Sequence, residues 1–280
     1  MDPVEKLSPE DFKALREYIY ASSGLFFSDA KLYFVENRIS KRLQQLKMTR
    51  YQDYLRIIKQ PSNKEERFCL FDAVTTNETS FYRNPPQIDA FARNILPKVV
   101  KSLKDRGQRV LKIWSAACSS GEEPYTLAMI LHDKKELLEG LTVQIYATDI
   151  SHDILEKVRQ ASYQAYTMRN LSSTYKDRYF VRDGTNFKIA DNIKKMVIPT
   201  YFNLVDYPGY VKFRNMDVIF CRNVLIYFDV KVKREIIKSF YQSLNKNAYL
   251  LIGHSESLHN INKDFKLEHF SRALAYLKPD

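Results

Sequence analysis

The sequence has few of the residues from which disulfide frameworks, metal centres and dinucleotide-binding loops are built. Its 280 residues include three cysteines and five histidines, without CxxC or HxxxH spacing. This composition argues against a disulfide-stapled secreted domain and against a zinc site, and it fits a reducing compartment. Only seven glycines are present, and no segment has the GxGxxG pattern of a dinucleotide-binding turn.

Long apolar runs are also missing. None approaches the roughly 20 residues that span a bilayer, and the first residues are polar, unlike a signal peptide. A cytoplasmic protein without membrane insertion is therefore expected. Acidic residues are in deficit, 33 against 44 basic ones, which gives a net charge of +11. This excess indicates an anionic partner, and by charge alone the partner could be nucleic acid, a membrane surface or an acidic protein.

Hydrophobic periodicity predicts an all-helical N-terminal domain over residues 1–74. Ser8 and Pro9, followed by acids, are typical of a helix start. A second helix is expected over residues 28–46, where apolar residues recur at steps of three and four. Arg38, Lys41 and Arg42 share its opposite face. An exposed charge cluster on a helix is often no more than a solvated face, so a partner contact there is one of two interpretations.

From residue 109 onward, apolar strands alternate with helices, which is typical of an α/β domain with a parallel sheet. A helix over residues 85–103 precedes this part. Residues 162–197 interrupt the alternation, and Asp183-Gly184 between two short apolar segments predicts a β-hairpin. We therefore expect a small antiparallel β insertion. The predicted strands of the main sheet cover residues 110–116, 143–148, 198–203, 217–221, 248–252 and 273–277.

The turn after the first strand is the strongest candidate for a cofactor site. Ligands of open α/β sheets bind where a strand breaks into a turn and a helix follows. The next strand ends at Asp149, where an acid commonly binds ribose hydroxyls. Glu122 or Glu123 at the helix start would repel a phosphate but suits a cationic ligand. S-adenosylmethionine carries a sulfonium and an α-amine and no phosphate, so the turn favours this cofactor over NAD or ATP.

Two further segments have polar residues at strand ends. Arg222-Asn223 lies between apolar runs and is hard to explain as core, and Tyr227 beside it becomes a pocket candidate. His254 follows a later strand and is interpreted as structural. The segment Asn84-Pro-Pro-Gln87 is similar to the NPPY motif of adenine methyltransferases, but it lacks the aromatic residue that stacks on the base. It is interpreted as a helix start.

Five motifs occur together and in order, and their combination resembles the CheR-type chemotaxis receptor methyltransferases (protein-glutamate O-methyltransferases). The motifs are TTNETSFYR at 75–83, WSAACSSGEEPY at 114–125, ATD at 147–149, FCRNVLIYF at 220–228 and GHSE at 253–256. The resemblance covers essentially the whole chain. It implies an S-adenosylmethionine-dependent methyltransferase domain of Rossmann-like fold that esterifies glutamates of chemoreceptors for adaptation, with S-adenosylhomocysteine as the product.

The resemblance also implies roles for individual residues. Arg83 and Tyr227 would lie nearest the transferred methyl group. The residues Arg38, Lys41 and Arg42 would read the receptor, an acidic helical bundle. Contacts with S-adenosylmethionine are expected from Asn77, Thr79, Arg83, Glu122, Asp149, Asn203, Leu204, Arg222 and Asn223.

The expected organisation has three parts. Residues 1–74 would form the receptor-reading helical domain, residues 75–90 a linker that contributes to the cofactor site, and residues 91–280 the methyltransferase domain with a β subdomain at about 162–197. This subdomain resembles one that docks a receptor's C-terminal peptide in some relatives. Neither a metal ion nor a nucleic-acid partner is expected. The protein is expected to be a monomer. The alternatives are a nucleic-acid methyltransferase, because the chain is basic and rich in tyrosine, and a non-catalytic receptor-binding adaptor with the same fold.

Overall fold

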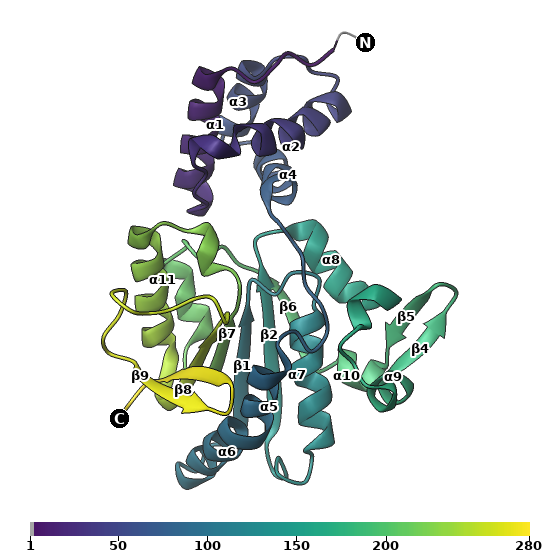
Figure 1. Cartoon of the computed structure of the whole chain (residues 1–280), viewed down its shortest axis with the longest axis vertical. Helices are drawn as coiled ribbons and strands as arrows, with labels where there is room; N and C mark the ends of the chain where they lie inside the picture. Colours follow the sequence, from purple (N-terminus) through teal and green to yellow (C-terminus); the bar gives the residue numbers. More distant parts are fainter. Residues whose placement is uncertain (1–2) are drawn as a thin grey trace.

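A computed structural model describes residues 3–280, and four helices form its N-terminal part (Figure 1). They are α1 (Pro9–Ser23), α2 (Leu32–Gln45), α3 (Tyr51–Lys59) and α4 (Lys64–Val74). The α1 helix begins where the Ser8 hydroxyl accepts a hydrogen bond from the Asp11 N–H and Pro9 occupies the first turn. The helix predicted over 28–46 is split, because a 3-10 turn at Asp29–Lys31 precedes α2. Apolar faces of the four helices enclose a core of their own.

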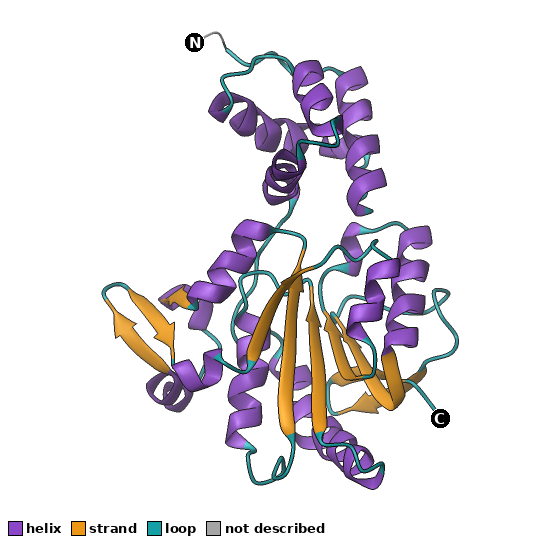
Figure 2. Cartoon of the chain, turned by 180° about the vertical axis from the view of Figure 1, so that it is seen from behind, coloured by secondary structure: helices purple, strands orange, loops and turns teal. Residues whose placement is uncertain are grey.

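A seven-stranded sheet organises the rest of the chain, in the order β6-β2-β1-β7-β8-β10-β9. Five strands are parallel: β1 (Val110–Ala116), β2 (Thr142–Asp149), β6 (Val197–Tyr201), β7 (Met216–Cys221) and β8 (Leu244–Ile252). In β10 (Ala273–Leu277) the chain runs antiparallel to β8 and to β9 (Lys266–Phe270). Figure 2 shows this sheet at the centre of the molecule. The α/β fold with a central sheet, predicted from the alternation of strands and helices, is confirmed.

The sheet departs from the predicted strands in four places, one of which is β8, because it begins at Leu244 and not at residue 248. The β9 strand was not predicted, because it is an edge strand of mainly polar, exposed residues. The last strand, β10, is antiparallel rather than parallel. The strand predicted over 198–203 ends at Tyr201, since the Asn203 side chain donates a hydrogen bond away from the sheet to the Ser22 carbonyl oxygen at 2.8 Å.

Helices cover both faces of the sheet. The helix predicted over 85–103 is α5 (Pro85–Ala90), a π-helical turn (Phe91–Ile95) and α6 (Leu96–Asp105). The widened turn precedes Pro97, which has no N–H to donate to the carbonyl four residues earlier. One face of the sheet is covered by these segments together with α7 (Glu122–Asp133) and α8 (His152–Gln160), and they pack into one apolar core. The other face is covered by α11 (Val230–Ser243) and a 3-10 helix (Pro208–Phe213), which pack into a second apolar core.

A small three-stranded antiparallel sheet lies beside the main one (Figure 2). Its order is β3 (Ser162–Gln164), β5 (Asn186–Ile189) and β4 (Phe180–Asp183). The predicted hairpin is its β4–β5 pair, and α9 (Ser173–Tyr179) and α10 (Asp191–Lys194) flank it. We call this region, residues 162–194, the β subdomain.

The end of α1 fastens the helical part to the α/β part. Gly24 ends α1 with φ 73°, and a Cβ atom there would lie 2.6 Å from Cγ1 of Val205. Only glycine combines this left-handed backbone with so close an approach. The Tyr20 hydroxyl also donates to the Asp229 carboxylate at 2.7 Å. No helix within residues 3–280 is long and apolar enough to cross a membrane.

Candidate functional site

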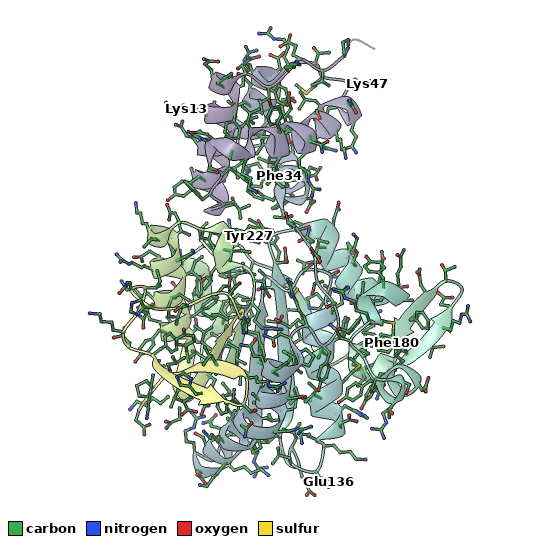
Figure 3. All side chains as sticks on the ribbon, viewed as in Figure 1. Lys13, Phe34, Lys47, Glu136, Phe180 and Tyr227 are labelled. Carbon is green, nitrogen blue, oxygen red and sulfur yellow. The ribbon has the colours of Figure 1, made fainter. Side chains whose placement is uncertain are left out.

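A cavity of about 580 Å³ lies at the carboxyl ends of β1, β2 and β7, beneath the helical part. In Figure 3, Phe34 of α2 lies above Tyr227, which follows β7, and both side chains line the cavity. Parallel strands place their carboxyl ends at one edge of a sheet, and ligands of open α/β sheets bind there. The cavity is therefore the candidate active site.

The turn after β1 brings main chain to the cavity wall. Ala117 and Ser119 have positive φ values of 54° and 51°, and Gly121 has a φ of 98°. A Cβ atom on Gly121 would lie 2.8 Å from the hydroxyl of Tyr163, which donates a hydrogen bond to the Ser120 carbonyl at 2.7 Å. Because Tyr163 belongs to β3, the β subdomain supports this turn from behind.

Asp149, at the end of β2, is almost fully buried and lines the cavity. Its two carboxylate oxygens accept hydrogen bonds from the main-chain N–H groups of Ser119 (2.9 Å) and Ser151 (3.0 Å). Burial raises the pKa of Asp149 to about 6, against the lowering effect of these hydrogen bonds. Each carboxylate oxygen has two lone pairs, so the group retains capacity for two hydroxyl donors of a ligand.

The two acids at the start of α7 face different ways. Glu122 does not line the cavity: it is buried under the turn, where its carboxylate accepts a hydrogen bond from the Ser120 hydroxyl at 2.7 Å. Burial raises its pKa. Glu123 lines the cavity instead, and the Ser115 hydroxyl donates to it at 2.7 Å. The acid that faces a ligand is thus Glu123, because one residue changes direction by about 100° on a helix.

Arg222 is the centre of a buried polar network in the cavity wall. Its guanidinium donates to Oε1 of Gln87 at 2.7 Å, to the Glu123 carboxylate at 3.0 Å and to the Arg83 carbonyl at 2.5 Å. The Arg222 side chain is only 3% exposed. The guanidinium therefore joins three segments of the cavity wall through these partners.

Glu256 holds the loop after β7 in place. Its carboxylate accepts hydrogen bonds from the main-chain N–H groups of Asn223 (2.9 Å), Ile226 (3.3 Å) and Gly253 (2.6 Å). The loop it supports carries Asn223 and Tyr227, which both line the cavity. The GHSE motif at 253–256 thus acts through its acid, a role that the sequence did not reveal.

The connection between α1 and α2 covers the cavity from above. The Phe26 N–H donates to the Tyr227 carbonyl at 2.9 Å, and Leu25 pairs with Phe228 as an isolated antiparallel bridge. Sequence reasoning missed this wall, although an apolar triplet in a short connection was a visible signal. Its cavity-lining residues are Ser23, Leu25, Phe26, Phe27, Lys31 and Phe34.

Most residues predicted to contact the cofactor converge on this one cavity. Eight of the nine line it, and Glu122 does not. Several of the eight also have structural partners: besides Arg222, Asp149 and Arg83, the Asn77 amide donates to the Thr75 hydroxyl at 3.3 Å and the Asn203 amide to the Ser22 carbonyl at 2.8 Å. The eight residues are Asn77, Thr79, Arg83, Asp149, Asn203, Leu204, Arg222 and Asn223.

The basic residues of α2 lie outside the cavity and are not equivalent. Arg42 forms a two-pronged ion pair with Glu66 of α4, at 2.9 and 2.6 Å, and is about one-fifth exposed. Lys41 is exposed, and Arg38 lies over the Phe34 ring at 5.3 Å. The structure thus leaves Lys41 and Arg38 available to a partner and holds Arg42 against α4.

The cavity suits S-adenosylmethionine in size and chemistry. Its volume lies within the 300–1,000 Å³ range of small-molecule sites. Asp149 presents a buried carboxylate to a diol, Glu123 adds a carboxylate to the lining although Arg222 pairs with it, and no cluster of phosphate-binding glycines is present. These residues fit a nucleoside with a cationic end better than a dinucleotide.

Comparison with known proteins gives the same picture. Residues 77–274 match the model "CheR methyltransferase, SAM binding domain", and residues 10–75 match "CheR methyltransferase, all-alpha domain". The chain is similar to chemotaxis protein methyltransferase 2 of Vibrio cholerae (34% identical, covering 98% of this chain and 94% of the relative). It is also similar to the chemotaxis protein methyltransferase of Borreliella burgdorferi (34%, 90% and 89%) and to chemotaxis protein methyltransferase 1 of Pseudomonas aeruginosa (33%, 95% and 97%). The chain belongs to the CheR methyltransferase family and is an S-adenosylmethionine-dependent methyltransferase of chemotaxis.

Proposed function

We propose that this enzyme transfers a methyl group to glutamate side chains in the cytoplasmic domains of chemoreceptors. The observation that carries the proposal is that Arg83 and Tyr227 line the same cavity as Asp149 and Glu123. The first pair would meet an acceptor carboxylate, and the second pair would hold the donor. S-adenosylmethionine, when bound, supplies an electrophilic methyl group on a sulfonium.

The acceptor needs no general base. A glutamate side chain has an ordinary pKa near about 4.3, so it is already a nucleophilic carboxylate at neutral pH. The protein has to orient this carboxylate and exclude water, and favourable orientation can contribute roughly 7–11 kcal/mol. The absence of a histidine from the residues that line the cavity agrees with this requirement.

Arg83 and Tyr227 are the groups we assign to this orientation. One Arg83 guanidinium nitrogen, Nη1, donates to the Glu78 carbonyl at 2.9 Å, and its Nε and Nη2 form no hydrogen bond within residues 3–280. The Tyr227 main chain is held by Phe26 and by the Glu256-supported loop. Arg83 would attract the carboxylate, and the Tyr227 hydroxyl would donate a hydrogen bond to it.

The acceptor would reach this site along α2. Arg38 and Lys41 give the exposed face of α2 a positive charge, which suits an acidic helical bundle. We also propose that a receptor tail can pair with β4, an edge strand of the small sheet whose outer side meets no strand within residues 3–280. The functional unit would be a monomer.

The test is to incubate the enzyme with methyl-labelled S-adenosylmethionine and receptor cytoplasmic fragments, then to locate base-labile methyl esters by mass spectrometry. Arg83→Ala and Tyr227→Phe should each lower kcat about 100-fold. Arg214→Ala and Tyr207→Phe are matched controls outside the cavity and should retain wild-type rates. Label on nucleic acid would overturn the proposal, and wild-type rates in both site variants would overturn the roles assigned to Arg83 and Tyr227.

A further inference from the structure

A second cavity, of about 290 Å³, shares a wall with the active site. We call it the Arg272 cavity. Asn84 lines it, while the preceding residue, Arg83, lines the active site. On the other side, a Cβ atom on Gly253 would lie 2.8 Å from the main-chain nitrogen of Asn223. Neighbouring residues, Arg83 with Asn84 and Asn223 with Gly253, therefore line the two cavities from opposite sides of one wall.

Polar side chains without partners face this cavity. Arg272, His254 and Asn84 line it, and no ion pair or side-chain hydrogen bond formed within residues 3–280 involves any of them. The one acid in the lining, Glu256, accepts three main-chain N–H groups. Its negative charge is thereby stabilised in place, while Arg272, whose side chain is exposed, forms no ion pair within residues 3–280. The cavity is set up to receive an anion.

Arg272 occupies a position that does not favour arginine. Phe270 and Ala273 pair across the β9–β10 turn, so Ser271 and Arg272 form its two-residue loop. Arg272 has a φ of 59°, in the left-handed region that glycine adopts without strain. A glycine at this position would adopt the same backbone conformation without strain.

The apolar wall of the cavity suits the stem of an acidic side chain. Phe270, Leu274 and Tyr276 line it beside the polar groups. A carboxylate on an aliphatic stem places its methylene groups against such a wall and its charge at the arginine. On a helix, side chains three to seven residues apart lie about 5–10 Å from one another. Because the adjacent residues Arg83 and Asn84 line the two cavities, an acceptor helix that presents one glutamate beside Arg83 can present a neighbouring acid here.

We propose that the Arg272 cavity is an accessory acceptor subsite that binds the carboxylate of a second acidic side chain of the acceptor helix, and so helps to select which glutamate is methylated. This inference rests on the proposed function. It assigns Arg272 as a specificity-determining residue that contacts the acceptor but does not contact the cofactor.

The test is a set of double-mutant cycles in the methylation assay. Each acid within seven residues of a methylated glutamate is changed to glutamine in the receptor fragment, one at a time. Each fragment is then assayed with wild-type enzyme and with Arg272→Gln. We expect Arg272→Gln to lower kcat/KM about tenfold, mainly through the acceptor KM. One acceptor substitution should cause the same loss with wild-type enzyme and no further loss with Arg272→Gln.

Two variants keep the result interpretable. Arg272→Gly suits the left-handed backbone, so its Tm should equal or exceed that of wild type while kcat/KM falls by the same factor. Arg214→Gln is the matched control, because Arg214 precedes the amino end of β7, whereas the active site lies at the carboxyl end of that strand, and its kcat/KM should not change. Affinity for S-adenosylhomocysteine, measured by calorimetry, should be the same in all of these enzymes.

The outcomes separate the two proposals. The accessory subsite is refuted if both Arg272 variants retain wild-type kcat/KM, or if the loss is equal with every acceptor fragment. Either result would show that Arg272 does not bind a neighbouring acid, and it would leave the proposed function intact. A wild-type enzyme that forms no esters on receptor fragments refutes the proposed function, and the accessory subsite with it.

Discussion

Nη2 of Arg222 donates a hydrogen bond to the main-chain carbonyl of Arg83 over 2.5 Å, across 139 positions of sequence. The same guanidinium pairs with Glu123 at 3.0 Å. One buried cation thus connects the segment before α5, the start of α7 and the end of β7. This arrangement makes Arg222 a residue that shapes the active site through its neighbours.

Replacing Arg222 with methionine should therefore destabilise the protein. The substitution leaves Glu123 without its cationic partner in a largely buried place, and breaking such a pair costs about 3–5 kcal/mol. Urea unfolding followed by circular dichroism measures the change in the free energy of unfolding. The double variant Arg222→Met/Glu123→Gln should recover part of the loss, since it removes the unpaired charge. Equal stability of both variants would contradict this account.

Glu256→Gln should lower kcat more than it lowers cofactor affinity. The glutamine amide would direct donor hydrogens toward main-chain N–H groups that now donate to the carboxylate. We expect a cost of about 1–3 kcal/mol in stability and a fall in kcat of about tenfold or more, because the loop that bears Tyr227 loses its support. Ser255→Ala, at an exposed neighbour, is the control. A change in KM for S-adenosylmethionine with unchanged kcat would argue against this role.

Gly121→Ala should weaken cofactor binding through the turn after β1. Alanine at a φ of 98° costs roughly 1–2 kcal/mol, and its Cβ would approach the Tyr163 hydroxyl to 2.8 Å. Tyr163→Phe removes that hydroxyl, so the double variant should lose less affinity than the sum of the single variants. Calorimetric titration with S-adenosylhomocysteine checks this prediction, and strict additivity would show that the contact has no effect.

Cofactor affinity should depend on pH through Asp149. If the ionised form binds the ribose hydroxyls, affinity is full above the pKa of about 6 and falls as pH drops below it, by about tenfold between pH 7.5 and pH 5. The raised pKa of Asp149 has the opposite effect on folding, because ionised Asp149 disfavours the folded state above pH 6. Through this group the protein is therefore more stable at pH 5, so weaker cofactor binding at pH 5 does not reflect unfolding. The Asp149→Asn variant should show a flat profile. A slope that persists in this variant would assign the titration to another carboxyl, such as Glu122.

Local sequence patterns predicted the features that depend on few neighbours. The parallel strands, the β4–β5 hairpin and Asp149 at the end of β2 follow from short apolar runs and turn residues. Three other features depend on contacts between distant segments. Glu123 rather than Glu122 faces the cavity because of the orientation of α7, Arg42 is held by Glu66 from another helix, and β9 is a polar edge strand. No pattern within ten or twenty residues contains that information.

The bridge between Leu25 and Phe228 affects the order in which parts of the protein can fold during synthesis. During synthesis the four N-terminal helices, with their own core, leave the ribosome about 150 residues before Phe228, a delay of roughly 8–30 s at usual elongation rates. The backbone partners of Leu25 and Phe26 in the α/β part emerge only with residues 227–228. The binding site is thus one of the last parts of the nascent chain to form. Binding of S-adenosylmethionine therefore requires that the chain has folded as far as residue 228.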